Sequence, residues 1–423
     1  LARTTPESRV LLATFSETLA NALRSRIRLL LGNEPRIGER LEVHAIGAIG
    51  RRLFEAQIGR ISIATPDQIR GFLRDASSAV PAHKFSAPFL WTEWSSIIDS
   101  RQILTWEEYR DVVRLGRKTR LSEGQRALLW SIFDKVRARL ADEKLLTESA
   151  MFTQLAQKLS AMTRPIFDFV VIDEAQDISI AQLRFASALS GGRPNALFFS
   201  GDLGQRIFQQ PFSWKELGVD VRGRSTRLRI NYRTSHQIRS QSDRLLGPEL
   251  SDVDGITEDR RGAISVFNGV PPEFSIEKNA DEEIARVSEW IKSRLAEGLK
   301  PHEIAIFVRS ADQLDRAKAA AKKADVPFVV LDDRVETRHG HLSIATMHLA
   351  KGLEFRAVAV MACDDEVIPL QSRIESAAEE SDLEEVYQTE KHLLYVACTR
   401  ARDHLVVSGV SPASEFLDDL RAG

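Results

Sequence analysis

The stretch VVIDEAQD, residues 170–177, joins an apolar run to two adjacent carboxylates, Asp173 and Glu174. A run of this kind is typical of a strand buried in a parallel sheet, and such sheets bind ligands at the carboxyl ends of their strands. There, Asp173 is suited to hold Mg²⁺, and Glu174 to orient a water molecule against a γ-phosphate. The plainer interpretation is that both carboxylates only cap the following helix.

A second apolar run with a polar end follows in FFSGDLGQ, residues 198–205. It ends in Gly201-Asp202, and Gln205 comes three residues later. A neutral amide is suited to sense a γ-phosphate or to hold the attacking water. The pair of runs favours a nucleotide-hydrolysing site over two unrelated helix caps.

Strand and helix patterns alternate on both sides of these runs, which predicts an α/β fold with parallel sheets. VLLATF at 10–15 reads as a strand, and Ser16 is a plausible cap for the helix after it. The first α/β domain is expected over residues 1–50 and 151–222, and the second over residues 223–423. Residues 51–150 carry long helical periods and few strand signals, which indicates a helical insertion.

The second domain shows its own series of elements. We expect strands at 302–310, 328–331, 342–346, 357–362 and 404–409, and helices over 281–296, 312–324 and 387–400. The acidic segment IESAAEESDLEE, residues 374–385, is interpreted as a solvated loop.

The composition sets few limits. A net charge of −2 over 423 residues neither indicates nor excludes nucleic acid, because a basic groove can lie in a neutral protein. Cys363 and Cys398 form neither a disulfide framework nor a metal-binding pattern, which fits a reducing compartment. No apolar run nears the roughly 18 residues of a membrane span, and no signal peptide is visible, so we expect a cytoplasmic protein.

Two arginines in the second domain stand at the ends of elements. LRINYRTSHQIRS, residues 228–240, places Arg233 before an amphipathic helix, and KHLLYVACTRARDHLVV, residues 391–407, places Arg400 at the end of a helix. Single arginines at such positions are usually surface salt-bridge partners. Facing an acidic ATP site, they would instead stabilise charge on the transferring phosphoryl group.

LSIATMHLAKGLEF, residues 342–355, lies between these arginines. Thr346 and His348 follow the end of a strand, where they are suitable donors to a phosphate backbone. Glu354 could accept a hydrogen bond from a ribose hydroxyl. Taken alone, a histidine of this kind is more often structural.

Together these motifs resemble the UvrD/Rep/PcrA type of superfamily-1 DNA helicases, in that family's order and at fitting spacings. The matching segments are VLLATFSETLANALRSRI (motif Ia), VHAIGAI (Ib), VVIDEAQD (II), SGDLGQRIF (III), LRINYRTS (IV), IATMHLAKGLEF (V) and LLYVACTRA (VI). The resemblance implies two RecA-like domains in series, with ATP and Mg²⁺ bound in the cleft between them and single-stranded DNA lying across both.

The resemblance also implies a role for individual residues. For the nucleotide these are Asp173 (Mg²⁺), Glu174 (catalytic base), Gln205, Arg233 and Arg400 (γ-phosphate) and Glu354 (ribose). For DNA they are Thr14, Phe15, His44, Thr346 and His348. Where the family usually has an aromatic pair after motif III, this chain has IFQQPFSW. Phe208 matches the first aromatic, Gln210 replaces the second, and Phe212 or Trp214 would stack on a base unless they pack in the core.

Two departures from the family bear on activity. The glycine loop and lysine that hold the phosphates precede motif Ia in the family, so here they would lie before Leu1. We therefore expect an N-terminally truncated chain that by itself binds ATP poorly and is inactive. The large helical domain that known members insert before motif V is replaced by about ten residues, DDRVETRHGH, which leaves the strength of unwinding open.

The leading hypothesis is an ATP-dependent single-stranded DNA translocase and helicase that moves 3′ to 5′. Its partners would be single-stranded DNA, or a duplex with a single-stranded tail, and a protein of repair, recombination or defence. The alternative is a nucleotide-gated clamp, or an accessory subunit of a nuclease or defence system, with little or no unwinding. RNA as the substrate is a third hypothesis, against which the DEAQD and NYR forms argue.

Overall fold

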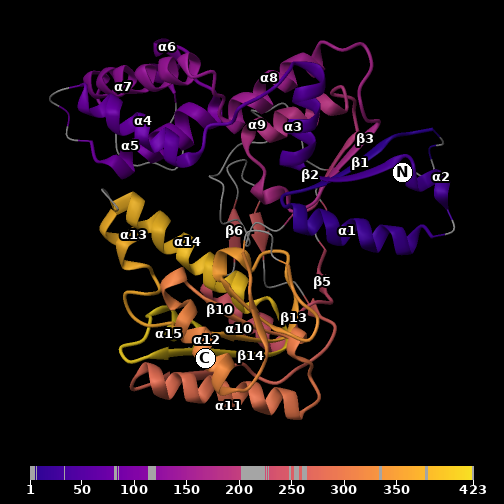
Figure 1. Ribbon diagram of the computed structural model, residues 1–423, viewed down its shortest axis with the longest axis vertical. Helices are drawn as coiled ribbons and strands as arrows, with labels where there is room; N and C mark the ends of the chain where they lie inside the picture. Colours follow the sequence, from indigo (N-terminus) through magenta and orange to yellow (C-terminus); the bar gives the residue numbers. More distant parts are fainter. Residues whose placement is uncertain are drawn as a thin grey trace. The chain divides into compact units, whose positions relative to one another are not determined.

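The computed structural model describes residues 5, 7–32, 34–80, 83, 85–112, 121–201, 224, 226, 228–246, 249–251, 257–259, 264–332, 336–376 and 380–421. These residues form two compact units. Unit 1 contains the described residues up to 201, and unit 2 contains those from 224 onward. Figure 1 labels the elements of both units.

Unit 1 is built on a parallel sheet with the strand order β2-β1-β3-β4. The strands are β1 (Val10–Thr14), β2 (Leu41–Ala45), β3 (Phe169–Ile172) and β4 (Leu197–Phe199). The central strand β1 has neighbours on both sides and helices on both faces. Its uninterrupted apolar sequence follows from this burial.

Helices cover both faces of this sheet. They are α1 (Glu17–Leu30) with the short α2 (Pro35–Gly38), and α3 (Ile46–Gln57), α8 (Glu148–Ser160) and α9 (Ile180–Leu189). Helix α1 packs against β2 through Ala20, whereas α3, α8 and α9 share the larger core with β1 and β3. The Ser16 cap is confirmed, since its hydroxyl accepts the Leu19 N–H at 3.2 Å.

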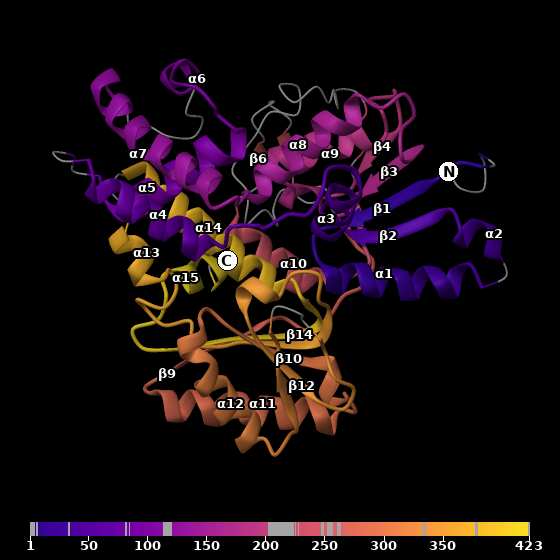
Figure 2. The ribbon, with the colours of Figure 1, turned by 45° about the horizontal axis from the view of Figure 1, so that its top comes forward.

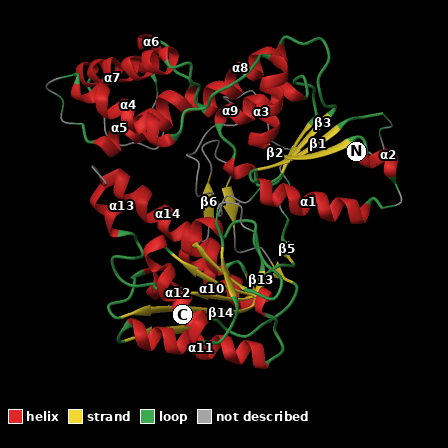
Figure 3. Ribbon diagram, viewed as in Figure 1, coloured by secondary structure: helices red, strands yellow, loops and turns green. Residues whose placement is uncertain are grey.

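Between α3 and α8 lies a helical segment with its own core. It comprises α4 (Pro66–Ser78), α5 (Ala87–Glu93), the π-helix η1 (Trp94–Asp99), α6 (Trp106–Asp111) and α7 (Glu123–Asp142). Figure 3 shows its described residues as helices joined by loops. Trp94, Tyr109 and Phe133 form an aromatic cluster at its centre.

The chain enters and leaves this helical segment at one place, where Ile63 and Leu146 form a parallel bridge. The interval predicted for the insertion, 51–150, also takes in the second half of α3 and the start of α8. Leu53 and Phe54 of α3 belong to the core of the sheet instead. The helical period alone cannot separate these helices from the insert, because both are amphipathic.

Unit 2 is built on a parallel sheet of six strands in the order β11-β12-β10-β13-β14-β9. The strands are β9 (Glu273–Glu277), β10 (Ile304–Val308), β11 (Phe328–Val330), β12 (Leu342–Thr346), β13 (Phe355–Val360) and β14 (Ala401–Val410). Figure 2 shows this sheet with α11 and α12 on one face. All five residues of β10 are buried, as the apolar sequence IAIFV requires.

Two cores lie on the two faces of this sheet. One holds α11 (Ala280–Ala296) and α12 (Leu314–Lys323), and the other holds α10 (His236–Ser242), α14 (Glu380–Cys398) and α15 (Phe416–Arg421). Unit 2 also contains the short helix α13 (Gln371–Ser376) and the strand pairs β5 (Ile230–Asn231) with β8 (Ile264–Ser265) and β6 (Glu249–Ser251) with β7 (Thr257–Asp259). Its 3-10 turns are η4 (Asp243–Leu245), η6 (Pro301–Glu303), η7 (Ala311–Gln313) and η8 (Met347–Leu349). A further 3-10 turn, η2 (Ala175–Asp177), belongs to unit 1. Both parallel sheets match the expected α/β class.

Three local expectations need correction or addition. The acidic segment 374–385 is not a loop in its described part, because it contributes the end of α13 and the start of α14. Strands β2 (LEVHA) and β9 (EFSIE) were not predicted. Both alternate polar and apolar residues over only five positions and lie at sheet edges, so their pattern is weak. No helix within the described ranges has the length and apolar character to cross a membrane.

Two helical glycines should respond differently to alanine substitution, because only the one on α3 contacts a neighbouring helix, α8. A Cβ built on Gly50 overlaps Cε1 of Phe152, whose ring is fully buried, whereas a Cβ on Gly71 of α4 meets nothing within 4 Å. We expect Gly50→Ala to destabilise the protein by about 1–3 kcal/mol through overpacking. Gly71→Ala should be neutral or stabilise it by up to about 1 kcal/mol. Calorimetric melting of both variants tests this, and equal melting temperatures would contradict it.

Candidate functional site

Five residues predicted to act in unit 1 lie at one edge of its sheet. In the strand register, His44 pairs with Ala13, Thr14 pairs with Ala45, and Ile172 pairs with Ala13. Neighbouring strands lie about 4.8 Å apart. His44, the Thr14-Phe15 pair and the Asp173-Glu174 pair therefore end three adjacent parallel strands at the same carboxyl edge.

The acidic turn after β3 is held in an unusual backbone conformation. The Asp173 N–H donates to the Ala13 carbonyl at 2.9 Å, which ties the turn to β1. Glu174 then adopts the left-handed region, with φ 56° and ψ 42°. This conformation costs a residue with a side chain roughly 1–2 kcal/mol. Such strain persists only where the surroundings enforce it, and it concentrates at functional sites.

Gln176 is the residue of this turn that sequence reasoning missed. Its Nε2 donates to Oε2 of Glu174 at 2.6 Å, and its side chain is almost fully buried. The bond orients the carboxylate that is predicted to be the catalytic base. The amide of this residue, two positions after that base at the end of an apolar run, is the sequence signal that could have found it.

The start of FFSGDLGQ packs directly on the acidic turn. The Ala175 N–H donates to the Ser200 carbonyl at 2.8 Å, and a Cβ on Gly201 would overlap Oε1 of Gln176. Only glycine fits this position without displacing the side chain that orients Glu174. Gln205, Phe208, Gln210, Phe212 and Trp214, together with Asp202, lie outside the described residues, so their assignments stay predictions.

The predicted DNA contacts of unit 1 differ in their surroundings. Thr14 is fully buried, and its hydroxyl has no hydrogen-bond partner among the described residues, whereas Phe15 is exposed. His44 Nε2 lies 3.2 Å from Oε2 of Glu42. Burial would raise the pKa of Glu42, but hydrogen bonds from Arg52, Arg9 and His44 outweigh it and lower that pKa. The negative carboxylate therefore holds the His44 ring by its Nε2.

In unit 2, three residues predicted to serve the nucleotide come together at the amino edge of the sheet. Nε of Arg233 lies 3.6 Å from Oε2 of Glu354, and both side chains are partly exposed. Nη1 of Arg400 donates to the carbonyl of Leu353, the neighbour of Glu354, at 3.4 Å. Motifs separated by more than 150 residues in the sequence thus meet just before β13 and β14.

Local hydrogen bonds position Arg233. The Asn231 Oδ1 accepts the backbone N–H groups of Arg233 and Thr234 at 2.8 and 3.2 Å, which forms a tight turn after β5. Tyr232 lies within this turn, and 71% of its surface is exposed. An aromatic ring so exposed, next to the Arg233–Glu354 pair, is available to stack on a planar ligand. Tyr232 was not among the residues predicted from the sequence.

Arg400 differs from Arg233 in its environment. Its side chain is fully buried, and its Nε donates to the Val396 carbonyl at 3.0 Å. Its guanidinium therefore closes the end of α14 and links it to the Leu353 carbonyl. In this conformation Arg400 is integrated into the fold, whereas Arg233 is exposed to solvent.

The predicted DNA contacts of unit 2 lie at the opposite edge. Thr346 ends β12 in register with Val308, and His348 lies in the turn η8 that follows. β13, with six residues, sets the two edges roughly 17 Å apart. The pKa of His348 is lowered to about 4, mainly by burial and then by the charge of Arg309, with a smaller contribution from Arg373 and an opposing effect of Glu390. His348 is therefore neutral at physiological pH.

Two segments of this chain match models of known protein domains. Residues 1–212 match the model of the UvrD/REP helicase N-terminal domain, and residues 331–411 match that of the UvrD-like helicase C-terminal domain. The chain belongs to the UvrD/Rep helicase family. Its two parallel sheets are accordingly RecA-like domains in series, as the motifs predicted.

Several curated relatives of this UvrD/Rep-type chain are helicases by name. The ATP-dependent DNA helicase UvrD2 of Mycobacterium tuberculosis is 23% identical over 520 residues, which cover 94% of this chain and 71% of that protein. UvrD2 of Mycobacterium bovis matches to the same extent. The ATP-dependent DNA helicase UvrD1 of M. tuberculosis is 34% identical over 121 residues, 26% of this chain and 14% of that protein.

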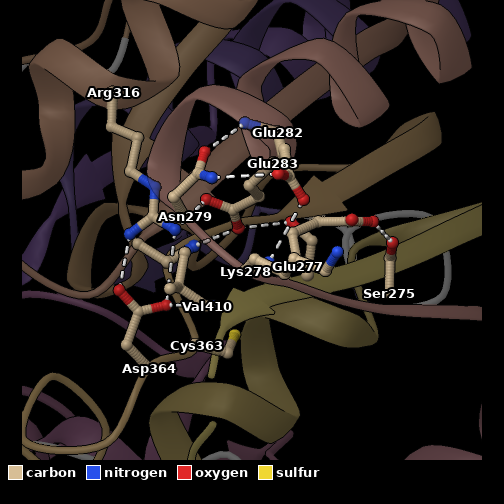
Figure 4. A network of polar contacts seen from close by, with 12 residues as sticks. Ser275, Glu277, Lys278, Asn279, Glu282, Glu283, Arg316, Cys363, Asp364 and Val410 are labelled. Atoms are coloured by element: carbon tan, nitrogen blue, oxygen red, sulfur yellow. Dashed lines mark hydrogen bonds and ion pairs between the residues drawn. The ribbon is translucent and has the colours of Figure 1, made fainter. Parts of the chain in front are cut away.

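Glu283, Arg316 and Asp364 form a charged cluster at the carboxyl edge of unit 2 that has a structural role. Glu283 of α11 is fully buried and accepts the Ala362 N–H at 3.0 Å and the Ser408 hydroxyl at 2.7 Å. Arg316 of α12 bridges Glu283 to Asp364 (Figure 4). Burial raises the pKa of Glu283, although Arg316 opposes the change. The cluster ties two helices to β13 and β14 and leaves the predicted site residues untouched.

The buried His348 of this helicase-family chain predicts a specific pH dependence of stability. Its folded pKa of about 4 lies below the ordinary 6.5, so the unfolded chain binds a proton more readily. Its contribution is complete above about pH 6.5 and is lost as the pH falls towards 4, by up to about 3 kcal/mol. We expect His348→Gln to reduce the difference in unfolding free energy between pH 7 and pH 4.5. Denaturant titrations measure it, and parallel pH curves for both proteins would contradict the assignment.

Proposed function

We propose that this chain provides the motor of an ATP-dependent single-stranded DNA translocase and helicase that moves 3′ to 5′. The observation that supports it best is the meeting of Arg233, Glu354 and Arg400 at the amino edge of unit 2. A motor of this family needs positively charged side chains that can bind the phosphates of a nucleotide. A partly exposed arginine paired at 3.6 Å with a carboxylate can exchange that partner for a phosphate at little cost.

In this proposal, unit 1 supplies the acidic half of the reaction. Asp173 and Glu174 are adjacent carboxylates at the end of a buried strand, and hard oxygen ligands of this kind suit Mg²⁺. Asp173 would hold the ion, which neutralises charge on the phosphates when bound. Glu174, oriented by Gln176, would accept a proton from the attacking water. Gln205 would sense the γ-phosphate.

Unit 2 would supply the cations and the ribose contact. Glu354 would accept a hydrogen bond from a ribose hydroxyl, which frees Arg233 for the γ-phosphate. Arg400 is buried and bonded to Leu353, so its approach to a phosphate would require the end of α14 to move. ATP binding and release would thus be coupled to a movement within unit 2.

DNA would contact the carboxyl edges of both sheets. His44, Thr14 and Phe15 in unit 1 and Thr346 and His348 in unit 2 lie at such edges, and a neutral His348 can donate to a phosphate without full charge. Phe15 would stack on a base, as would Phe212 or Trp214. The names of the relatives favour DNA over RNA, and a helicase over the nucleotide-gated clamp. A single-stranded tail is the expected loading site.

The sharpest test of the motor uses Glu174→Gln in the full-length protein. This change keeps the shape of the side chain but removes its basicity, so ATP turnover stimulated by single-stranded DNA should fall at least about 100-fold, while ATP binding is retained. The wild type should displace streptavidin from the 5′ end of an oligonucleotide. The exposed Glu289→Gln is the matched control and should keep full turnover. Normal turnover in Glu174→Gln would remove Glu174 from its role.

A second test concerns the exposed ring of Tyr232. If it stacks on the base of the nucleotide, Tyr232→Ala should raise the KM for ATP about tenfold with kcat little changed, in line with roughly 1–3 kcal/mol for a stacked base. Tyr232→Phe keeps the ring and should behave as the wild type. Steady-state ATPase assays measure both constants. A phenylalanine variant as impaired as the alanine variant would show that the hydroxyl, not the ring, matters.

A further inference from the structure

A buried charged network lies beneath the carboxyl edge of unit 2, and no role proposed above uses it. Glu390 of α14 is fully buried. Its two carboxylate oxygens accept both Nε and Nη2 of Arg309 at 2.5 Å, Nη1 of Arg373 at 3.0 Å and the Leu370 N–H at 3.3 Å. Two parallel bonds to one guanidinium fix the relative orientation of both groups.

Arg309 connects this network to the predicted DNA contacts. It directly follows Val308, the last residue of β10, which lies in register with Thr346. Helix α14 also packs against η8, the turn that contains His348. The charges of Arg309, Glu390 and Arg373 all act on His348, as the shift of its pKa indicates. Glu390 therefore fixes the side chain of Arg309, at the end of the strand that pairs with β12 just before the turn of His348.

The same helix ends at the opposite edge of the sheet. Eight residues of α14, about 12 Å, separate Glu390 from Cys398 at its end, and Arg400 follows. Arg400 is bonded back to Val396 of the helix and across to Leu353, beside Glu354. One helix thus contacts the predicted nucleotide residues at its end and packs against the turn of His348 along its length, where Glu390 binds Arg309.

Stability alone is a poor explanation of this network. Removing two charges from water is costly, and well-packed apolar side chains often stabilise a core as well as a buried ion pair does. What a bidentate pair adds is a fixed geometry between two elements. Here those elements are the end of β10 and the middle of α14. No backbone hydrogen bond joins these two elements in the described part of unit 2.

We propose that Glu390 is a positioning residue of the motor, which couples the nucleotide edge of unit 2 to its DNA edge by holding Arg309 and the Thr346–His348 turn rigidly on α14. The inference rests on the proposed function. Coupling means that a bound nucleotide changes the affinity for DNA, and that DNA changes the affinity for the nucleotide by the same factor. Without the Glu390–Arg309 pair, each ligand would still bind, but neither would affect the other.

The experiment measures this coupling in the full-length protein with Glu390→Gln. The Kd for a fluorescent oligo(dT) is determined by anisotropy with and without a non-hydrolysable ATP analogue. In the wild type the two Kd values should differ at least about fivefold. In Glu390→Gln their ratio should fall to within about twofold of one, while the Kd without nucleotide and the ATPase rate without DNA stay within about twofold of the wild type.

Two further variants separate positioning from a loss of folding. The double variant Arg309→Gln/Glu390→Gln removes the pair without leaving a buried Arg309 unpaired. It should lose the coupling to the same extent as Glu390→Gln, and its melting temperature should be no lower than that of Glu390→Gln. Glu273→Gln removes the ion pair with Arg286 at 2.7 Å, on β9 and α11, and should keep the wild-type ratio.

The outcomes are distinguishable. A wild-type ratio of one would overturn the motor itself, and with it the role of Glu390. A normal wild-type ratio that persists in both Glu390 variants would overturn the positioning role alone. A parallel loss of DNA affinity and basal ATPase, with the ratio preserved, would reduce Glu390 to a structural residue.

Discussion

Both units depend on the direction of their parallel strands. Because every strand of a sheet runs the same way, all carboxyl ends gather at one edge and all amino ends at the other. Buried strands such as β1 and β10 supply the apolar core that keeps this arrangement rigid, at about 1.5–3 kcal/mol for each large side chain. Polar residues that follow or precede these strands are thereby brought together without any contact along the sequence.

The two units use this constraint differently. In unit 1 the predicted residues for DNA and for the nucleotide end neighbouring strands at one edge, His44 beside Thr14 and Thr14 beside Asp173. In unit 2 the two groups are divided between opposite edges, with Arg233 and Glu354 at one and Thr346 at the other. The proposed division of the two ligands between opposite edges calls for a rigid element between them, and α14 runs between the predicted residues of both.

Two buried carboxylates of unit 2 differ in what they connect. Glu283 is satisfied by Arg316, Ser408 and a backbone N–H, and it ties helices to strands through partners that are not predicted site residues. Glu390 is satisfied just as fully, but its partner Arg309 follows directly on Val308, which lies in register with Thr346. Burial and pairing alone do not distinguish these two carboxylates. Their neighbours in the fold do.

Much of this protein could be predicted from its sequence. The apolar run before Asp173, the cap at Ser16 and the order of the motifs determine the α/β class, the RecA-like series and the family, because they depend on local patterns and spacing. The edge strands β2 and β9 escaped prediction because short alternating strands are stabilised mainly by their neighbours. The pairing of Arg233 with Glu354, the support of Glu174 by Gln176 and the buried Arg309–Glu390 pair were decided only by the tertiary structure. Each joins side chains through geometry that a linear sequence does not contain, and two of them span 80 or more residues.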